Sequence, residues 1–198
     1  MGLNIKALAV GAALTGLASV AQAGGWTLDG DTSQIAFGSI KNNNNGEVHG
    51  FDQMSGTVTE DGAVEITIDL ASVETWIDIR NERMVEHVFK NVANATISTQ
   101  LDMTEVNGLG VGETTQLEAT ATLALVGTEY DVDAELFVAR LSEDKVMVTT
   151  ANMIMLHPED VGIDEGVSVL KNLAELSGIT RVSPVTLRLM FSADETAS

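Results

Sequence analysis

The chain of 198 residues contains no cysteine. This absence excludes disulfide bonds, a thiolate nucleophile, thiolate-bound zinc and covalently attached c-type haem. Only two prolines are present, so no proline-rich linker divides the chain, and its length suits one domain with a substantial hydrophobic core. Aromatic residues make up 4% of the sequence. A transmembrane β-barrel needs aromatic girdles at two interfaces, and this low content argues against one.

Basic residues are also scarce, with 10 Lys and Arg against 29 Asp and Glu and a formal net charge of −19. Nucleic-acid binding requires a basic surface to contact phosphates, so this class of function is excluded. The same charge would repel anionic lipid headgroups. The acidity is typical of a protein that depends on charge for its solubility or lives in a salty habitat.

Motifs for catalysis and metal binding are missing as well. The three histidines, His49, His87 and His157, are far apart in the sequence, and none forms an HxH or i,i+4 pair, so no metal site is predicted. No G-x-S-x-G nucleophile elbow and no Gly-rich phosphate loop before a helix is present. Asp131 and Asp133 alternate along one strand and are interpreted as its outer face, not as a glycosidase pair. We predict no catalytic residue and no cofactor.

The first 23 residues have the pattern of a secretory signal peptide. Lys6 supplies the positive charge, an apolar run from Ala7 to Val20 follows, and Ala21-Gln22-Ala23 matches an A-x-A cleavage site. The run is short for a membrane span. We therefore expect cleavage after Ala23, a periplasmic protein and one mature domain, residues 24–198, without stable membrane insertion.

Eight segments alternate apolar and polar residues, as antiparallel strands with one buried face do. The clearest carries Leu117, Ala119, Ala121, Leu123 and Leu125 on one face. Glu, Asp and Thr occupy the other face of most strands, as expected if the outer surface of the barrel is exposed to water. Eight such strands in succession predict a closed up-and-down barrel or a sandwich. The predicted strands span residues 26–40, 48–60 (broken), 63–70, 95–103, 114–126, 129–140, 145–155 and 184–192.

Two segments have helical periodicity instead. Apolar residues recur at i, i+1, i+4 and i+5 within residues 80–89, which predicts a short amphipathic helix. We expect it to close one mouth of the barrel, with Met84, Val88 and Phe89 facing inward. A second helix is predicted to begin near Asp164 and to stop at Gly178, and its apolar face consists of Val167, Leu170, Leu173, Ala174 and Leu176.

The residues around the first helix resemble the YceI-like family, secreted bacterial lipocalin-like barrels associated with polyisoprenoid binding. The family pattern has a strand ending in Ala-Ser-(Ile/Val)-(Asp/Glu)-Thr, an Arg followed by an acidic or amide residue, and an aliphatic-rich helix ending in Phe. Ala71–Thr75, Arg80-Asn81, Met84 and Phe89 fill these places, whereas Arg83 stands where many members carry His. Similarity continues through most of the chain from the opening strand, residues 26–37, to the last strand, residues 185–191.

The resemblance implies an all-β fold, an eight-stranded antiparallel lipocalin-like barrel with two short helices. It also implies a non-catalytic binding protein that holds a long apolar isoprenoid-type lipid, either an isoprenoid quinone or a polyprenyl chain. Two alternatives stay open, a barrel enzyme acting on an apolar substrate and a ligand-free envelope or stress protein. The oligomeric state is open too, a homodimer included.

The fifth and sixth predicted strands suggest where a ligand would pass. A two-residue turn at Gly127-Thr128 suits type II′ and would place Ala121 opposite Ala134 on the inward face. An eight-stranded barrel is wide enough to be filled by side chains or to hold one small ligand. From the residues alone both readings stay open, and the resemblance favours a ligand. The residues expected to contact it are Phe37, Ile66, Ile68, Trp76, Met84, Phe89, Ile97, Ala121, Leu123, Leu125, Tyr130, Val132 and Ala134.

Arginine is rare in this chain, so Arg80 and Arg83 in the first helix are conspicuous. One reading is structural, with ion pairs that fix the helix to the barrel. The other is that they meet a polar ligand head at the barrel mouth, because a guanidinium offers several hydrogen-bond donors. For Trp76, packing and rim contact with a ligand are the corresponding alternatives.

Overall fold

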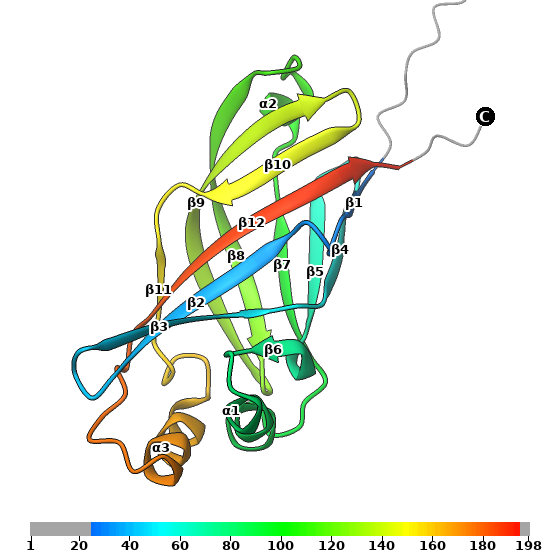
Figure 1. Cartoon of the computed structure of the whole chain (residues 1–198). Coiled ribbons are helices and arrows are strands. Elements are labelled where there is room, and N and C mark those ends of the chain that lie inside the picture. The colour runs from blue at the N-terminus through cyan, green and yellow to red at the C-terminus, as the bar shows by residue number, and fades with distance from the viewer. Residues whose placement is uncertain (1–24, 195–198) are drawn as a thin grey trace, which may run out of the picture.

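The computed structural model describes residues 25–194. The predicted signal peptide, residues 1–23, lies outside the described residues and stays a prediction. The described chain forms an elongated β-barrel with helices at both ends (Figure 1). No helix in the described part is long and apolar enough to cross a membrane.

All strands belong to one antiparallel sheet, and it closes because β1 pairs with β4 on one side and with β12 on the other. The predicted eight-stranded barrel is confirmed: three of the eight strands are each broken in two, as β1/β2, β3/β4 and β10/β11, and β6 adds a short pairing to β3. The strands are β1 (Trp26–Leu28), β2 (Gln34–Lys41), β3 (Asn45–Phe51), β4 (Met54–Val58), β5 (Ala63–Asp69), β6 (Val73–Glu74), β7 (Asn94–Gln100), β8 (Thr114–Leu125), β9 (Thr128–Ser142), β10 (Lys145–Thr150), β11 (Ile154–Leu156) and β12 (Ser183–Ala193).

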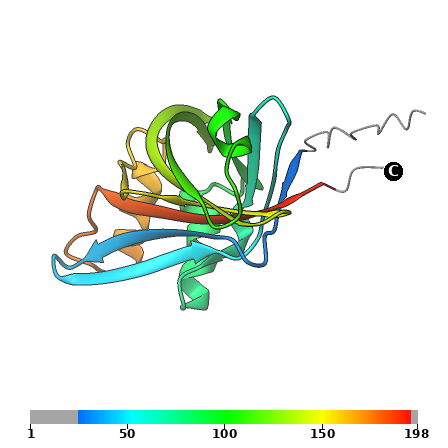
Figure 2. The same ribbon diagram turned by 90° about the horizontal axis from the view of Figure 1, so that it is seen from above.

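The barrel stays closed across the break between β1 and β2. There Met190 of β12 accepts a hydrogen bond from Asp29 N (2.8 Å) and donates one from its own N–H to Ser33 Oγ (2.9 Å). These bonds replace the missing ladder pairs. Beyond the break, β2 and β3 continue as a long hairpin toward the end of the barrel where residues 78–88 and 164–173 lie (Figures 1 and 2).

The β8–β9 hairpin differs from the sequence-based expectation in its turn. The two turn residues are Val126 and Gly127, both with positive φ (49° and 81°), as in a type I′ turn. Ala119 therefore pairs with Ala134, and Ala121 pairs with Val132. The predicted pairing of Ala121 with Ala134 is wrong by two residues, but a shift of two keeps every side chain on its predicted face.

The first predicted helix consists of two joined segments, α1 (Asp78–Arg83) and a π-helical turn, Met84–Val88. In this turn Phe89 N donates to Met84 O at 2.9 Å, an i to i−5 bond. Inserting one extra residue into the turn is typical of functional sites in helices. Here it brings Met84, Val88 and Phe89 to one buried face, with 8, 1 and 3% exposure.

The second predicted helix is α3 (Asp164–Leu173), shorter than expected. Glu175, with φ of 51°, ends it before Gly178 is reached, and Leu176 N closes the end by donating to Lys171 O (3.0 Å). Leu173 is 44% exposed, so its predicted place on the apolar face is wrong.

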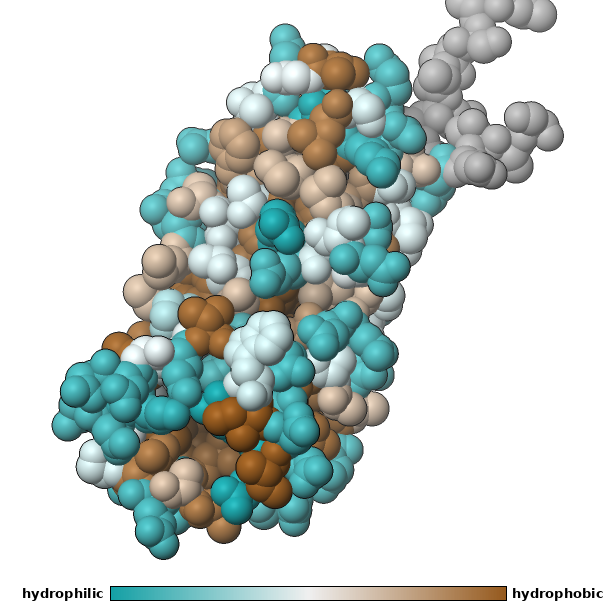
Figure 3. Space-filling view, viewed as in Figure 1, coloured by the Kyte–Doolittle hydropathy of each residue, from teal (hydrophilic) through white to brown (hydrophobic). Residues whose placement is uncertain are grey.

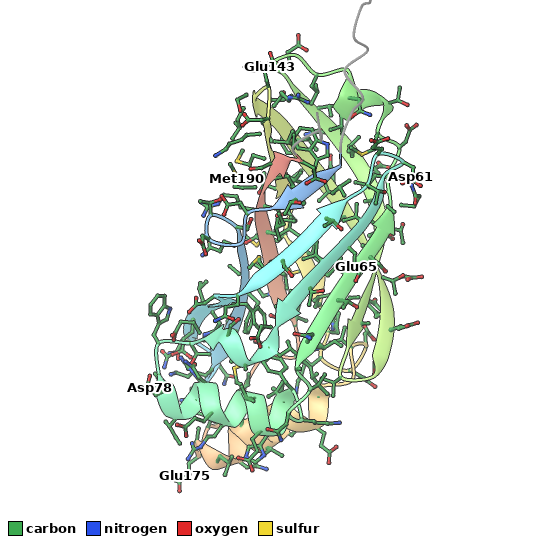
Figure 4. All side chains as sticks on the ribbon, turned by 90° about the vertical axis from the view of Figure 1, so that its right-hand side faces the viewer. Asp61, Glu65, Asp78, Glu143, Glu175 and Met190 are labelled. Carbon is green, nitrogen blue, oxygen red and sulfur yellow. The ribbon has the colours of Figure 1, made fainter. Side chains whose placement is uncertain are left out.

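A further short helix, α2 (Thr104–Asn107), was not predicted. It follows β7 and covers the barrel end opposite α1 and α3 (Figure 1). Met103 and Val106 are buried there. The barrel is thus covered by helices at both ends, while acidic side chains such as Glu65 on β5 lie on the outside (Figure 4).

Candidate functional site

The barrel contains two adjoining chambers. The barrel chamber, between the strands, has a volume of about 160 Å³, and the mouth chamber, under α1 and α3, has about 440 Å³. Five residues line both chambers, so the two chambers are adjacent. These residues are Ile35, Ile97, Leu123, Leu156 and Val185.

The barrel chamber is lined by apolar side chains, with Thr99 the exception among the described residues. Its width comes from three alanines on β8 and β9: the cross-strand pair Ala119 and Ala134, and Ala121 beside them. An apolar cavity of this kind stays dry and favours apolar ligands. The chamber can therefore accept a hydrocarbon chain.

The mouth chamber is closed by a lid, which we define as α1, the π-helical turn and α3 (residues 78–88 and 164–173). Gly166 lets α3 lie directly on the π-helical turn, because a Cβ there would meet His87 O at 2.4 Å and Val88 Cα at 2.6 Å. Hydrophobic residues gather around a hollow at this end of the surface (Figure 3).

Gly166→Ala is expected to lower the free energy of unfolding by about 1–3 kcal/mol, the usual cost of adding atoms to a filled contact. The new methyl would collide with backbone atoms that cannot rotate away. Urea denaturation of the wild type and the variant measures the change. Gly46→Ala is the matched control, since a Cβ there meets nothing within 4 Å. Equal midpoints for Gly166→Ala and the wild type would contradict the close contact.

The lid is fixed to the barrel through Thr75, Arg80 and Asn81, residues of the family-like motif. Thr75 is fully buried, and its N–H donates to Asn81 Oδ1 at 2.9 Å. Arg80 Nη2 donates to Thr75 O at 2.5 Å. The motif therefore holds the start of α1 against β6.

A polar cluster, defined as Ser39, Lys41, Glu47, His49 and Arg80, lies at one side of the mouth chamber. The Glu47 carboxylate accepts from Lys41 Nζ at 2.8 Å and from Arg80 Nη1 at 2.7 Å. Burial alone would raise the pKa of Glu47, but the hydrogen bonds from Lys41 and Arg80 outweigh it and hold this pKa below its usual value. Glu47 is therefore ionised at neutral pH and lies between two cations.

His49 is the buried end of this cluster, with 6% exposure. Its Nε2 lies 3.1 Å from Ser39 Oγ, and its ring centroid is 5.2 Å from that of Phe37. Burial, and then the charge of Arg80, lowers the pKa of His49 to about 4. The imidazole is consequently neutral at neutral pH.

Aromatic rings continue from His49 across the chamber. The centroids of Phe37 and Phe51 are 5.5 Å apart, and those of Phe51 and Phe89 are 5.9 Å apart. All three rings line the mouth chamber. The chamber thus has an aromatic wall that leads from the polar cluster to the lid.

The structure brings eleven of the thirteen predicted site residues to the cavity wall; whether they contact a ligand stays a prediction. They are Phe37, Ile66, Ile68, Met84, Phe89, Ile97, Ala121, Leu123, Leu125, Val132 and Ala134.

Trp76 and Tyr130 line neither chamber. The predicted place of Tyr130 on the cavity wall is therefore wrong, whereas rim contact of Trp76 with a ligand stays a prediction. Trp76 is 81% exposed, and its backbone has a positive φ of 65°. Tyr130 is 36% exposed. It lies near the β8–β9 turn, where β9 pairs only with β8 among the described strands.

The polar cluster was missed by sequence reasoning, apart from Arg80. A signal was present, because Glu47, His49 and Phe51 alternate on one strand. Across residues 25–194, no three His, Asp or Glu side chains come together to hold a metal ion.

Comparison with known proteins identifies relatives of this barrel. The family model described as YceI-like domain matches residues 26–188. A polyisoprenoid binding domain from Saccharophagus degradans, implicated in plant cell wall breakdown, is 35% identical with a TM-score of 0.83, covering 85% of this chain and 98% of that one.

Two more distant solved structures share the fold alone. BcnA from Burkholderia cenocepacia is 16% identical with a TM-score of 0.63, and the alignment covers 82% of this chain and 98% of that chain. A Campylobacter jejuni YceI protein is 16% identical with a TM-score of 0.53, covering 74% and 85%. No curated protein sequence matches. With the family model matching most of its length, this chain belongs to the YceI-like family.

Proposed function

We propose that this protein is a periplasmic binding protein that holds a long apolar isoprenoid-type lipid, an isoprenoid quinone or a polyprenyl chain, inside its barrel without catalysing a reaction. The observation that carries the proposal is the pair of adjacent chambers inside the barrel, of which the barrel chamber has an almost entirely apolar lining. The 35% identical domain from S. degradans, named for polyisoprenoid binding, supports the class of ligand.

The size of the two chambers also supports a long ligand. Each CH₂ group moved from water into an apolar wall contributes about 0.8 kcal/mol. A chain of several isoprene units that fills both chambers would gain enough to offset the cost of immobilising it. A short molecule in one chamber would leave the other without contacts, so two adjacent chambers favour a long chain.

Binding is favoured over catalysis by the placement of polar groups. The barrel chamber offers a reacting group only Thr99 among its described lining residues. The carboxylate of Glu47 is held in two ion pairs, and its lowered pKa makes it a poor general base. The location in the periplasm is proposed from the signal-peptide pattern of residues 1–23.

Solvent extraction of the protein purified from the periplasm of an expressing bacterium, followed by mass spectrometry, tests the proposal. We expect about one isoprenoid lipid per chain and an intact mass that corresponds to residues 24–198. Bulk phospholipid alone in the extract, or protein confined to the cytoplasm, would contradict it. A chemically altered prenyl product that accumulates with time would favour the enzyme instead.

A further inference from the structure

Large hydrophobic side chains are exposed on the surface beside α1. Val48, Trp76, Ile77 and Ile79 are 66, 81, 43 and 51% exposed, and we call these four residues the apolar patch. Figure 3 shows hydrophobic residues around the hollow at this end of the molecule. A group of exposed apolar side chains on a folded protein typically marks a surface that another molecule covers.

The apolar patch is continuous across two segments of the chain, which Arg80 ties together. Arg80 Nη1 donates to Glu47, the neighbour of Val48, at 2.7 Å. Arg80 Nη2 donates to the carbonyl oxygen of Thr75, the neighbour of Trp76, at 2.5 Å. Since successive residues of a strand point to opposite faces, Val48 points outward while Glu47 lines the mouth chamber. Val48 and Trp76 therefore lie close together on the outer surface.

Trp76 is held in its exposed position by the backbone around it. Its φ of 65° is uncommon for a large side chain. The Glu74 carboxylate accepts a hydrogen bond from the Trp76 N–H, and Thr75 between them is fully buried. A strained conformation persists only where the surrounding contacts determine it. The indole combines a large apolar face with a polar N–H, which suits the boundary between hydrocarbon and water.

The apolar patch adjoins the mouth chamber. Ile77 and Ile79 are each about half exposed and also line this chamber. A long prenyl chain that crosses water on its way to the chamber loses free energy for every exposed CH₂ group. A mouth that touches a membrane would let the chain pass directly from one hydrocarbon environment to another.

The charges beside the patch match a surface that carries both signs. The charged residues that line the mouth chamber are three cations and one anion, Lys41, Arg80, Arg83 and Glu47, so this lining is net cationic in a chain of net charge −19. Asp78, at the start of α1, lies on the outside of the same end (Figure 4). Zwitterionic lipid headgroups offer phosphates to the cations and ammonium groups to the carboxylates.

We infer that the apolar patch is a docking surface for a zwitterionic lipid bilayer, on which the protein binds reversibly with the lid toward the membrane. The inference rests on the proposed function, because docking gives the prenyl chain a route between bilayer and barrel. Four side chains bury little area, so the contact is peripheral and is not a stable insertion.

Sedimentation with vesicles of phosphatidylethanolamine and phosphatidylcholine, free of isoprenoid lipid, measures the docking. We expect the wild type to bind, Trp76→Asn to bind more than tenfold more weakly and Val48→Ser several-fold more weakly, because each variant removes apolar area. Asparagine tolerates the positive φ of this position. Val111→Ser is the matched control, since Val111 is 53% exposed beyond α2 at the opposite barrel end, and it should bind as the wild type does.

Vesicles that contain brominated phosphatidylcholine locate the contact, because bromine quenches only a nearby tryptophan. The chain has two, Trp76 and the buried Trp26, which is 8% exposed. We expect quenching in the wild type and none in Trp76→Phe, which keeps an apolar ring for docking and emits only from Trp26. Equal quenching in both proteins would contradict the proposed orientation.

The outcomes separate the docking surface from the proposed function. Binding of a dansyl-labelled prenyl alcohol in vesicle-free buffer tests the proposed function alone, and Val48→Ser should not change it, because Val48 lines neither chamber. Vesicle binding without prenyl binding would overturn only the proposed function. Prenyl binding without vesicle binding, or equal vesicle binding by Trp76→Asn and the wild type, would overturn only the docking surface.

Two further results would assign the patch to another partner. Shielding of Trp76 from iodide at high protein concentration without vesicles would identify a second copy of this chain as the occupant and overturn the inference. Tighter binding to vesicles of phosphatidylglycerol alone would overturn the match to zwitterionic headgroups. We expect weaker binding there, because the net charge of −19 is repelled by an anionic surface.

Discussion

Ala121→Phe is expected to abolish binding of a long prenyl chain while leaving the barrel folded. Ala121 lines the barrel chamber opposite Val132, where the small side chain contributes directly to the free width. A phenyl ring there would occupy much of a chamber of about 160 Å³. The lost contacts correspond to many CH₂ groups at about 0.8 kcal/mol each, so the affinity should fall by more than a hundredfold.

Lipid per mole of protein after extraction, together with the thermal unfolding midpoint, measures this effect. Glu118→Phe is the matched control, because it adds the same ring to the exposed outer face of the same strand. Ala134→Leu adds less bulk and should give a partial loss. Undiminished lipid in Ala121→Phe would show that the chain does not pass Ala121. A large fall in the midpoint would show that protein side chains already fill the space.

The sequence predicts which side chains face the inside of the barrel, because successive residues of a strand point to opposite faces of the sheet. The β8–β9 register was wrong by two residues, yet Ala119, Ala121 and Ala134 still face inward. The turn was misplaced because Val126 adopts a positive φ of 49°, which β-branched residues avoid. Gly127-Thr128 was consequently the better candidate from the sequence.

The lid was predictable in part. The i, i+4, i+5 spacing of Met84, Val88 and Phe89 correctly identified one buried face. The π-helical turn and the close contact at Gly166 could not be predicted, since both depend on how α3 packs against residues about 80 positions earlier.

The polar cluster could not be predicted either, because it too joins segments that are distant in the sequence. Glu47 and His49 lie on β3, which also contains Gly46 and Gly50 and follows an Asn-rich loop, so the alternation of this strand was only partly recognised. Their partner Arg80 is 33 residues from Glu47. Only the folded chain shows that an arginine on the lid and a histidine on the barrel share one corner of the chamber.

His49 should make the folded state sensitive to mild acid. Burial and the charge of Arg80 lower the pKa of His49 to about 4 in the folded protein, whereas its ordinary value is 6.5. Lys41 acts in the same direction and Glu47 in the opposite one. Between these two values the unfolded chain binds a proton that the folded chain does not. The free energy of unfolding therefore decreases as the pH falls from about 6.5 to about 4. Below pH 4 the contribution that comes from the lowered pKa of His49 is fully lost.

The expected size is about 2–3 kcal/mol of unfolding free energy between pH 7 and pH 4.5, because each unit of pKa difference corresponds to about 1.4 kcal/mol. Urea denaturation at both pH values measures it. The many carboxylates also respond to acid, but His49→Phe retains them, so the variant should lose about 2–3 kcal/mol less than the wild type. His157→Gln, which removes an exposed histidine, should behave as the wild type does. Identical losses in His49→Phe and the wild type would mean that His49 is protonated in the folded protein at pH 4.5, contrary to the lowered pKa.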